Sequence, residues 1–292
     1  MTDTPNSTQG RLLIIAGSDS SGGAGLQADI KTAAAFGAYT STAVTAVTVQ
    51  TTDGVQRVEL LAPDLVAEQA RAALTDIGAD VVKIGMLGSA AVASAVADVL
   101  EEHAQDALIV LDPVMVSSSG DTLLDDEAQG LMRDRLLPLA DLVTPNAPEA
   151  TVLTGLEVGD AETLRAAGDK LLGMGAGAAL MKGGHISGNM VVDVLVTDDG
   201  VATMTSPRLR SRSTHGTGCT LASAVASNLA LGADIGEAVS TAREYVFEAI
   251  RTAPGFGSGK HGPLNHGLAM AEGDADEEAA NPFAALKALK NE

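Results

Sequence analysis

The stretch LLIIAGSDSSGGAGLQAD, from Leu12 to Asp29, decides the fold class of this chain. An apolar run ends in a glycine-rich turn, and a helical pattern starts directly after the turn. Further apolar runs, rich in β-branched residues, follow at Ala43–Val49, Asp80–Ile84, Ala107–Leu111, Asp141–Val143 and Ala178–Met181. Such runs, without regular polar alternation, are typical of strands that are buried on both faces of a sheet.

Helical patterns fill the intervals between these runs. Two stripes of apolar residues have helical spacing: Val66, Ala70, Ala73, Leu74 and Ile77, and then Ile235, Val239, Ala242, Val246 and Ile250. The alternation predicts an α/β fold of three layers, with helices on both faces of a mostly parallel sheet. One stretch departs from it, because Val191–Thr197 and Val201–Ser206, joined by a turn, are expected to form an antiparallel hairpin.

Acidic residues dominate the charge of the chain: 38 Asp and Glu against 18 Lys and Arg give a net charge of −20. A nucleic-acid partner is therefore not expected, since phosphate binding needs a basic surface. The mean hydropathy of +0.19 places this charge outside an apolar interior. Proteins of salt-accumulating halophiles have such a surface, although an ordinary acidic cytosolic protein is the alternative. The single cysteine, Cys219, excludes an intramolecular disulfide and predicts a reducing, cytoplasmic setting.

The two ends of the chain differ from its middle. Residues 1–10 are polar, show no signal-peptide pattern and are expected to be disordered. Residues 11–266 hold the strand and helix patterns and are predicted to form one domain. Residues 267–292 form an acidic tail that we expect to be mobile or loosely docked. The long uncharged runs at 32–52 and 213–233 are too polar to span a membrane, so no membrane partner is expected.

The glycine-rich turn after the first strand has two interpretations. Gly23, Gly25 and Ala28 fit the G-x-G-x-x-A fingerprint of dinucleotide-binding enzymes, but the acidic residue expected about 20 positions later is absent. A glycine turn beside another ligand explains the pattern equally well. Gly259-Lys260 lacks the upstream glycine of a P-loop, so we expect any ATP site here to work without one.

Polar residues follow the other strands at the place where ligands bind in such sheets, beyond the carboxyl ends. The amide of Gln50 offers a donor beside an acceptor, which complements the edge of an aminopyrimidine; plain solvation is the alternative. Asp112, Asn146 and Glu149 supply the oxygen ligands that Mg²⁺ prefers, although Asn146 also suits a helix cap. Lys182 stands on a glycine loop and suits a phosphate.

The segment STHGTGCT, from Ser213 to Thr220, carries the strongest chemical signal. Gly216 and Gly218 expose backbone N–H groups at the start of an apolar helix, which predicts an anion site. Cys219 lies in the first turn of this helix, where we expect the pKa of a thiol to be lowered. A small residue packed at a helix start is the alternative for Cys219.

The chain resembles the hydroxymethylpyrimidine/phosphomethylpyrimidine kinases from about Arg11 to His266. The motifs that carry the resemblance occur in the family's order: AGSDSSGGAGLQAD, VQ, KIGML, LDPVM, TPNAPEA, LMKGGH, THGTGCTLASA and GKHGPLNH. The resemblance implies a three-layer ribokinase-like fold and an ATP- and Mg²⁺-dependent kinase of thiamine biosynthesis. It also implies small-molecule substrates and a homodimer, since relatives are often dimers.

The resemblance further implies roles for single residues. The pyrimidine is expected to bind at Gln50, Asp29, Gly17 and Met86; ATP at Lys182, Asn146 and Thr217; and Mg²⁺, through water, at Asp112 and Glu149. The catalytic group would comprise Cys219, Gly216, Gly218 and Lys182. The wider superfamily has an aspartate base where this chain has Cys219, so proton transfer by the thiol is a hypothesis.

Three alternatives to a pyrimidine kinase stay open on the sequence alone. A pyridoxal kinase shares the resemblance, and the hydrogen-bonding edge of Gln50 is the argument against it. An oxidoreductase would use the fingerprint at residues 23–28. A non-catalytic protein would sense the pyrimidine without turnover.

Overall fold

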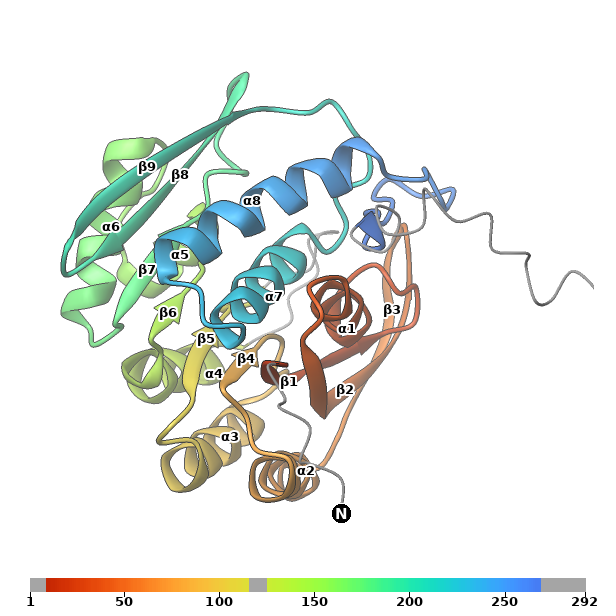
Figure 1. The fold of residues 1–292 in the computed structure, drawn as a ribbon, viewed down its shortest axis with the longest axis vertical. Coiled ribbons are helices and arrows are strands. Elements are labelled where there is room, and N and C mark those ends of the chain that lie inside the picture. The colour runs from red at the N-terminus through yellow and green to blue at the C-terminus, as the bar shows by residue number, and fades with distance from the viewer. Residues whose placement is uncertain (1–8, 116–124, 269–292) are drawn as a thin grey trace, which may run out of the picture.

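A nine-stranded sheet runs through the computed structural model, which describes residues 9–115 and 125–268 (Figure 1). The strands are β1 (Arg11–Asp19), β2 (Tyr39–Thr51), β3 (Gly54–Leu60), β4 (Val81–Ile84), β5 (Leu108–Leu111), β6 (Leu142–Val143), β7 (Ala178–Met181), β8 (Met190–Thr197) and β9 (Gly200–Pro207). Their order in the sheet is β3-β2-β1-β4-β5-β6-β7-β8-β9. Strands β2 to β7 of this order pair in parallel, whereas β3, β8 and β9 pair antiparallel with their neighbours.

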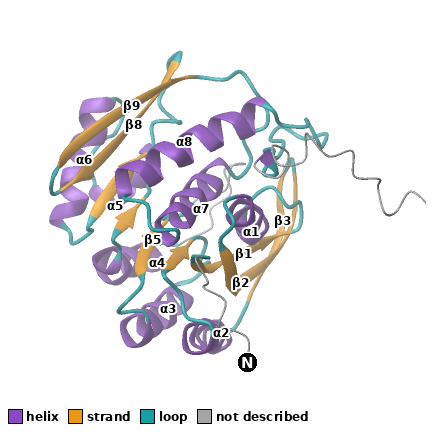
Figure 2. Ribbon diagram, in the orientation of Figure 1, coloured by secondary structure: helices purple, strands orange, loops and turns teal. Residues whose placement is uncertain are grey.

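Helices cover both faces of the sheet (Figure 2). On one face lie α1 (Gly25–Ala35), α7 (Thr217–Ala230) and α8 (Ile235–Arg251). On the other lie α2 (Pro63–Asp76), α3 (Ala90–His103), α4 (Asp126–Leu131), α5 (Ala147–Thr154) and α6 (Ala161–Gly173). The expected three-layer α/β architecture, with a mostly parallel sheet, is therefore confirmed.

The alternation of side chains along β1 shows why the sheet needs both helix layers. Leu13 and Ile15 pack into the core on the α2–α6 face, whereas Leu12, Ile14 and Ala16 pack into the core below α1, α7 and α8. All five side chains are buried. A strand that is apolar on both faces would expose one of them to water if either helix layer were missing.

The predicted strands and the hairpin are all present, and the structure adds one strand. Both β1 and β2 continue past their predicted ends, through polar residues that sequence analysis assigned to loops. The added strand, β3, has the sequence GVQRVEL and is exposed along most of its length, so it lacks the apolar run that identified the others. It pairs with β2 as an antiparallel edge of the sheet.

The predicted helical stripes lie on α2 and α8, where Val66, Ala70, Val239 and Ala242 are buried. Of the segment 1–10, the structure describes Gln9 and Gly10, and the carbonyl of Gly10 accepts a hydrogen bond from the N–H of Tyr39. Most of the acidic tail lies outside the described residues. Within residues 9–115 and 125–268, no helix is both long and apolar enough to cross a membrane.

Candidate active site

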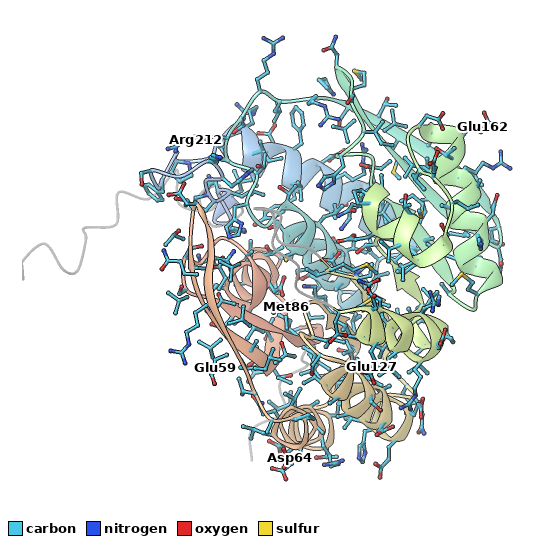
Figure 3. All side chains as sticks on the ribbon, turned by 180° about the vertical axis from the view of Figure 1, so that it is seen from behind. Glu59, Asp64, Met86, Glu127, Glu162 and Arg212 are labelled. Atoms are coloured by element: carbon cyan, nitrogen blue, oxygen red, sulfur yellow. The ribbon has the colours of Figure 1, made fainter. Side chains whose placement is uncertain are left out.

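A cavity of about 950 Å³ opens beyond the carboxyl ends of β1, β2, β5 and β7, beside the first turn of α7. Parallel strands bring the residues that follow them to one edge of the sheet, which explains why residues far apart in sequence meet here. The lining includes all of the expected site residues except Asp29: Gly17, Gln50, Met86, Asp112, Asn146, Glu149, Lys182, Gly216, Thr217, Gly218 and Cys219. Met86 lies near the middle of the molecule (Figure 3).

Asp29 is absent from the lining of this cavity, so its expected role in substrate binding stays a prediction. Its carboxylate is fully buried and lies 2.9 Å from Nζ of Lys83, and it accepts a hydrogen bond of 2.7 Å from Oγ of Ser223. Burial alone would lower the pKa of Lys83, but the carboxylate of Asp29 raises it, so this lysine stays charged. Asp29 therefore holds the buried cation of Lys83, which itself lines the cavity.

A second buried ion pair joins residues that follow β5 and β7. Nζ of Lys182 lies 2.9 Å from Oδ1 of Asp112, which also accepts a hydrogen bond of 3.1 Å from Thr144. Although burial opposes ionisation of both groups, their attraction raises the pKa of Lys182 and lowers that of Asp112. A Cβ on Gly218 would lie 3.2 Å from Nζ of Lys182, so the glycine lets the helix start approach the ammonium closely.

The first turn of α7 supplies the other part of a strong anion site. Gly216 precedes the helix with φ of +79°, and a Cβ there would lie 1.9 Å from the carbonyl oxygen of Gly23. Both the positive φ and this contact require glycine. The N–H groups of Gly218 and Cys219 lie in the first turn, where a helix offers them no carbonyl partner. These N–H groups and the ammonium of Lys182 together favour bound phosphate.

The protonation of Cys219 differs from what the sequence predicted. Burial raises the pKa of the thiol to about 12, although the cation of Lys83 and the N–H of Gly25 oppose the shift. The expectation of a lowered pKa was wrong because desolvation outweighs the partial positive charge of the helix start at this depth. The thiol is therefore protonated at neutral pH.

Asn146 and Glu149 cap α5, and they line the cavity at the same time. Oδ1 of Asn146 accepts from the N–H of Glu149 (3.0 Å), and Oε2 of Glu149 accepts from the N–H of Asn146 (2.8 Å). Burial, reinforced by the carboxylate of Asp112, raises the pKa of Glu149 to about 7, although Lys182 opposes this. A cation between Glu149 and Asp112 would offset the repulsion between their two carboxylates and the cost of burying them. The pair therefore fits a divalent ion.

Protein side chains would supply only some of the ligands of such an ion. Within the described ranges, no group of three or more His, Cys, Asp or Glu side chains forms a complete metal site. Mg²⁺ binds well to one or two carboxylates when water and phosphate oxygens complete its coordination. Asp112 and Glu149 match that donor set.

Three residues for which the sequence predicted no role, Asp19, Thr48 and His215, lie in the part of the cavity that contains Gln50. Oε1 of Gln50 accepts a hydrogen bond of 3.3 Å from Oγ1 of Thr48, and Nε2 of Gln50 lies 3.4 Å from Nε2 of His215. His215 in turn lies 2.8 Å from Oδ2 of Asp19, which is 196 residues away in the chain. Asp19, Thr48 and His215 all line the cavity.

The cavity extends from Gln50 to the hairpin β8–β9 and the side of α8. There, Nε of Arg243 on α8 lies 2.8 Å from Oδ2 of Asp193 on β8. Oδ1 of Asp193 accepts a hydrogen bond of 2.8 Å from the N–H of Gly183, next to Lys182. This pair could not be predicted from the sequence, because it joins a strand and a helix that are distant in the chain.

The fold and this site define a small-molecule phosphotransferase of the ribokinase-like class. The sequence profile of the phosphomethylpyrimidine kinase family matches residues 19–265. The chain belongs to this family, as the motifs predicted, and the fingerprint at residues 23–28 therefore lies in a kinase.

Two relatives show how far the similarity extends. The hydroxymethylpyrimidine/phosphomethylpyrimidine kinase of Streptomyces coelicolor is 46% identical over 269 residues, which cover 92% of this chain and 98% of that protein. The thiamine biosynthesis bifunctional protein of Geobacter sulfurreducens is 47% identical over 261 residues, which cover 89% of this chain but 53% of that protein. The chain thus spans about half the length of the bifunctional relative.

Solved structures of two kinds of kinase resemble this one. The phosphomethylpyrimidine kinase of Clostridium difficile superimposes with a TM-score of 0.74 at 40% identity, over 83% of this chain and 100% of that one. The pyridoxal kinase of Staphylococcus aureus, in complex with AMP-PCP and pyridoxal, has a TM-score of 0.80 at 33% identity, over 89% and 94% of the two chains.

Proposed function

We propose that this chain uses MgATP to phosphorylate 4-amino-5-hydroxymethyl-2-methylpyrimidine, and then phosphorylates the resulting monophosphate to the diphosphate. One observation carries the proposal: the amide of Gln50 and the anion site of Lys182 and α7 lie in one cavity. The amide complements an aminopyrimidine edge, and the anion site complements a transferring phosphoryl group.

Each group around the anion site would have its own role in phosphoryl transfer. The N–H groups at the start of α7 would bind the oxygens of the γ-phosphoryl group, and Lys182 would neutralise charge on the leaving phosphate. Asp112 and Glu149 would hold Mg²⁺ through water, and the ion would supply positive charge against the phosphates. Since phosphoryl transfer has a loose transition state, positioning and charge stabilisation supply most of the rate.

Cys219 would relay a proton late in the reaction. Because its thiol is protonated at neutral pH, Sγ can accept the hydroxymethyl proton only as its own proton leaves for an oxygen of the transferred phosphoryl group. The substrate oxygen then carries the new P–O bond, and the thiol is unchanged at the end.

Replacing Cys219 tests this relay. We expect Cys219→Ala to lower kcat by about tenfold to a hundredfold, with little change in KM, because a relay acts in the transition state. Cys219→Ser keeps an exchangeable proton and should lose less. Steady-state turnover within about twofold of wild type for Cys219→Ala would remove the relay and leave the anion site as the main catalytic device.

The first measurement is ADP release with MgATP in about 1 M KCl, which screens the acidic surface. Hydroxymethylpyrimidine and pyridoxal are offered separately, and the products are weighed by mass spectrometry. A diphosphate from the pyrimidine supports the two-step kinase. Turnover of pyridoxal alone would contradict the proposed pyrimidine substrate. Pyridoxal is the second candidate substrate because the similar kinase of Staphylococcus aureus was solved in complex with it. No turnover of either, with folding verified by circular dichroism, would favour a non-catalytic sensor.

We further infer a homodimer that pairs through the β2–β3 edge. Val47 and Val49, on one face of β2, are 50% and 49% exposed, and exposed apolar side chains there favour association. We expect light scattering to report twice the chain mass for wild type and a monomer for Val47→Glu/Val49→Glu. A wild-type monomer would contradict this interface.

A further inference from the structure

Lys83 on β4 is fully buried and lines the cavity, yet phosphoryl transfer at Lys182 and α7 does not use it. Its Nζ lies 2.9 Å from Oδ2 of Asp29, and Oδ1 of Asp29 accepts a hydrogen bond of 2.7 Å from Oγ of Ser223. Burial raises the pKa of Asp29, but Lys83 and Ser223 oppose that rise, and Asp29 in turn raises the pKa of Lys83. The pair is therefore ionic and fixes a positive charge at one place beside the cavity.

The ammonium of Lys83 lies near the start of α7 and keeps hydrogen-bonding capacity. Ser223, which binds its partner carboxylate, lies one helical turn after Cys219. An ammonium has three N–H groups, and within residues 9–115 and 125–268 its one hydrogen-bond partner is Asp29. A Cβ on Gly85 would lie 3.0 Å from Nζ, so the glycine leaves the space that the ammonium occupies. Lys83 can thus donate to a further anion.

The other lysine and arginine side chains of the cavity are already engaged. Among the described residues that line it, these side chains are Lys83, Lys182, Arg208 and Arg243. Lys182 belongs to the anion site that would bind the phosphates of ATP. Arg208 donates to three backbone carbonyls of the loop after β7, and Arg243 pairs with Asp193 at the hairpin β8–β9. Lys83 is therefore the cation that is left for a second anionic group.

The two proposed phosphorylations differ in the charge of the group that accepts the phosphoryl group. In the first, a neutral hydroxyl accepts it and loses its proton. In the second, the acceptor is the phosphate of the monophosphate, which carries a charge of about −1.5 to −2 at pH 7 and attacks through an oxygen that has no proton to lose. That oxygen bonds to the γ-phosphorus, while the bond from this phosphorus to the oxygen of the leaving ADP breaks. Two negatively charged phosphates must therefore meet in the second step.

We propose that Lys83 binds the phosphate of the monophosphate and thereby determines whether the chain can carry out the second phosphorylation. This role rests on the proposed function and adds a residue to it. The acceptor phosphate cannot take the place of the γ-phosphoryl group at the start of α7, because both are present at once. The ammonium of Lys83 supplies a separate positive charge, which offsets the repulsion between the two phosphates. A neutral hydroxyl acceptor causes no such repulsion and gains little from this charge.

Removing both charges of the pair tests this role. Lys83→Met alone would leave the carboxylate of Asp29 buried without a cation, which is strongly destabilising, whereas a neutral pair is tolerated. In Lys83→Met/Asp29→Asn the asparagine also keeps an oxygen for Ser223. With MgATP, kcat/KM is measured separately for hydroxymethylpyrimidine and for its monophosphate, with products weighed by mass spectrometry. We expect about a tenfold or greater loss with the monophosphate and less than about a threefold loss with the alcohol, because hydrogen bonds to charged groups are the stronger ones.

Two further variants accompany this one. Arg135→Met is the control, because Arg135 pairs with Asp98 and Glu101 and does not line the cavity. Its ratio of the two kcat/KM values should stay within about twofold of wild type. Gly85→Ala keeps both charges of the pair, but its Cβ, 3.0 Å from Nζ, would displace the ammonium. We expect its ratio of monophosphate to alcohol turnover to fall by about threefold or more, because charge stabilisation depends on exact placement.

The ratio separates binding of the acceptor phosphate from support of the fold, because general loss of structure lowers both values together. Equal losses with both acceptors, or an unchanged ratio, in Lys83→Met/Asp29→Asn would overturn the inference and leave the proposed function intact. If circular dichroism shows that this variant does not fold, an unchanged ratio in Gly85→Ala would overturn it instead. Wild type that forms no diphosphate from the monophosphate would contradict the proposed function itself, and the role of Lys83 with it.

Discussion

His266 shows how burial of one side chain links the stability of this protein to pH. Its ring is buried below α7, where Nε2 lies 3.1 Å from the hydroxyl of Thr220. Burial, and then the positive charge of Lys31, lower the pKa of His266 to about 4 from its ordinary 6.5. Between these two values the unfolded chain binds the proton and the folded chain does not.

The free energy of unfolding should therefore fall as the pH drops from 6.5 toward 4. His266 accounts for about 3 kcal/mol of this fall, since one pKa unit corresponds to about 1.4 kcal/mol. In His266→Phe the fall should be smaller by about that amount. Urea unfolding of both proteins across this pH range measures it, and equal slopes would contradict the prediction.

Some residues of the site could be predicted from the sequence and others could not. Gln50 lies at the end of β2, and Asp112 and Lys182 directly follow β5 and β7. Their place in the cavity could therefore be predicted from the strand pattern alone. Asp19 and His215 could not be paired in this way, because their hydrogen bond depends on how two distant loops meet. The raised pKa of the Cys219 thiol depends on its burial in the folded protein, which the local sequence does not predict.

At the scale of elements, two glycine-rich loops depend on arginines that follow β9. The guanidinium of Arg208 donates to three backbone carbonyls of the loop after β7: Gly184 at 2.7 Å, Ile186 at 2.5 Å and Gly188 at 2.8 Å. Arg212 donates in the same way to the carbonyls of Gly255, Gly257 and Gly259. The loop that Arg208 holds also lines the cavity, through Gly184 and His185.

We expect Arg208→Lys to raise KM for ATP by about fivefold or more, with a smaller effect on KM for the pyrimidine. A lysine ammonium lacks the planar fork that reaches three carbonyls at once, so the loop beside Lys182 would lose its fixed shape. Arg57→Lys, at an exposed ion pair on β3, is the control and should leave both constants unchanged. Equal rises in both KM values would instead indicate general loosening of the fold.

Elements differ in how well their sequence predicts them. The buried strands β4 to β7 have apolar runs, which contain β-branched residues in β4, β5 and β6, and their predicted bounds agree with the structure to within a residue or two. β3 has no such run, because an edge strand with exposed faces needs no apolar side chains, and only its pairing with β2 defines it. The polar ends of β1 and β2 were missed because they too lack an apolar run, although Asp19 and Thr48 there are buried.

At the scale of the whole molecule, the net charge of −20 acts on a fold whose interior is apolar. Carboxylates such as Glu59, Asp64, Glu127 and Glu162 lie around the periphery (Figure 3). Their mutual repulsion opposes the compact state, and salt screens it over a Debye length that falls from about 10 Å at 0.1 M to about 3 Å at 1 M. A salt-accumulating source remains a prediction that rests on this charge.

We therefore expect Tm to rise as KCl increases from about 0.1 M to about 1 M, with most of the gain at the lower concentrations, where the screening length changes most. Scanning calorimetry measures this, and a parallel series in sucrose separates screening from general solvent exclusion. The triple variant Glu68→Gln/Asp76→Asn/Glu157→Gln, at exposed positions on and after α2 and α5, removes three negative charges. Since repulsion grows with net charge, this variant should start with a higher Tm at low salt and gain less from KCl than wild type does. A Tm that does not depend on KCl, or an equal gain in both proteins, would mean that the acidic surface does not limit stability.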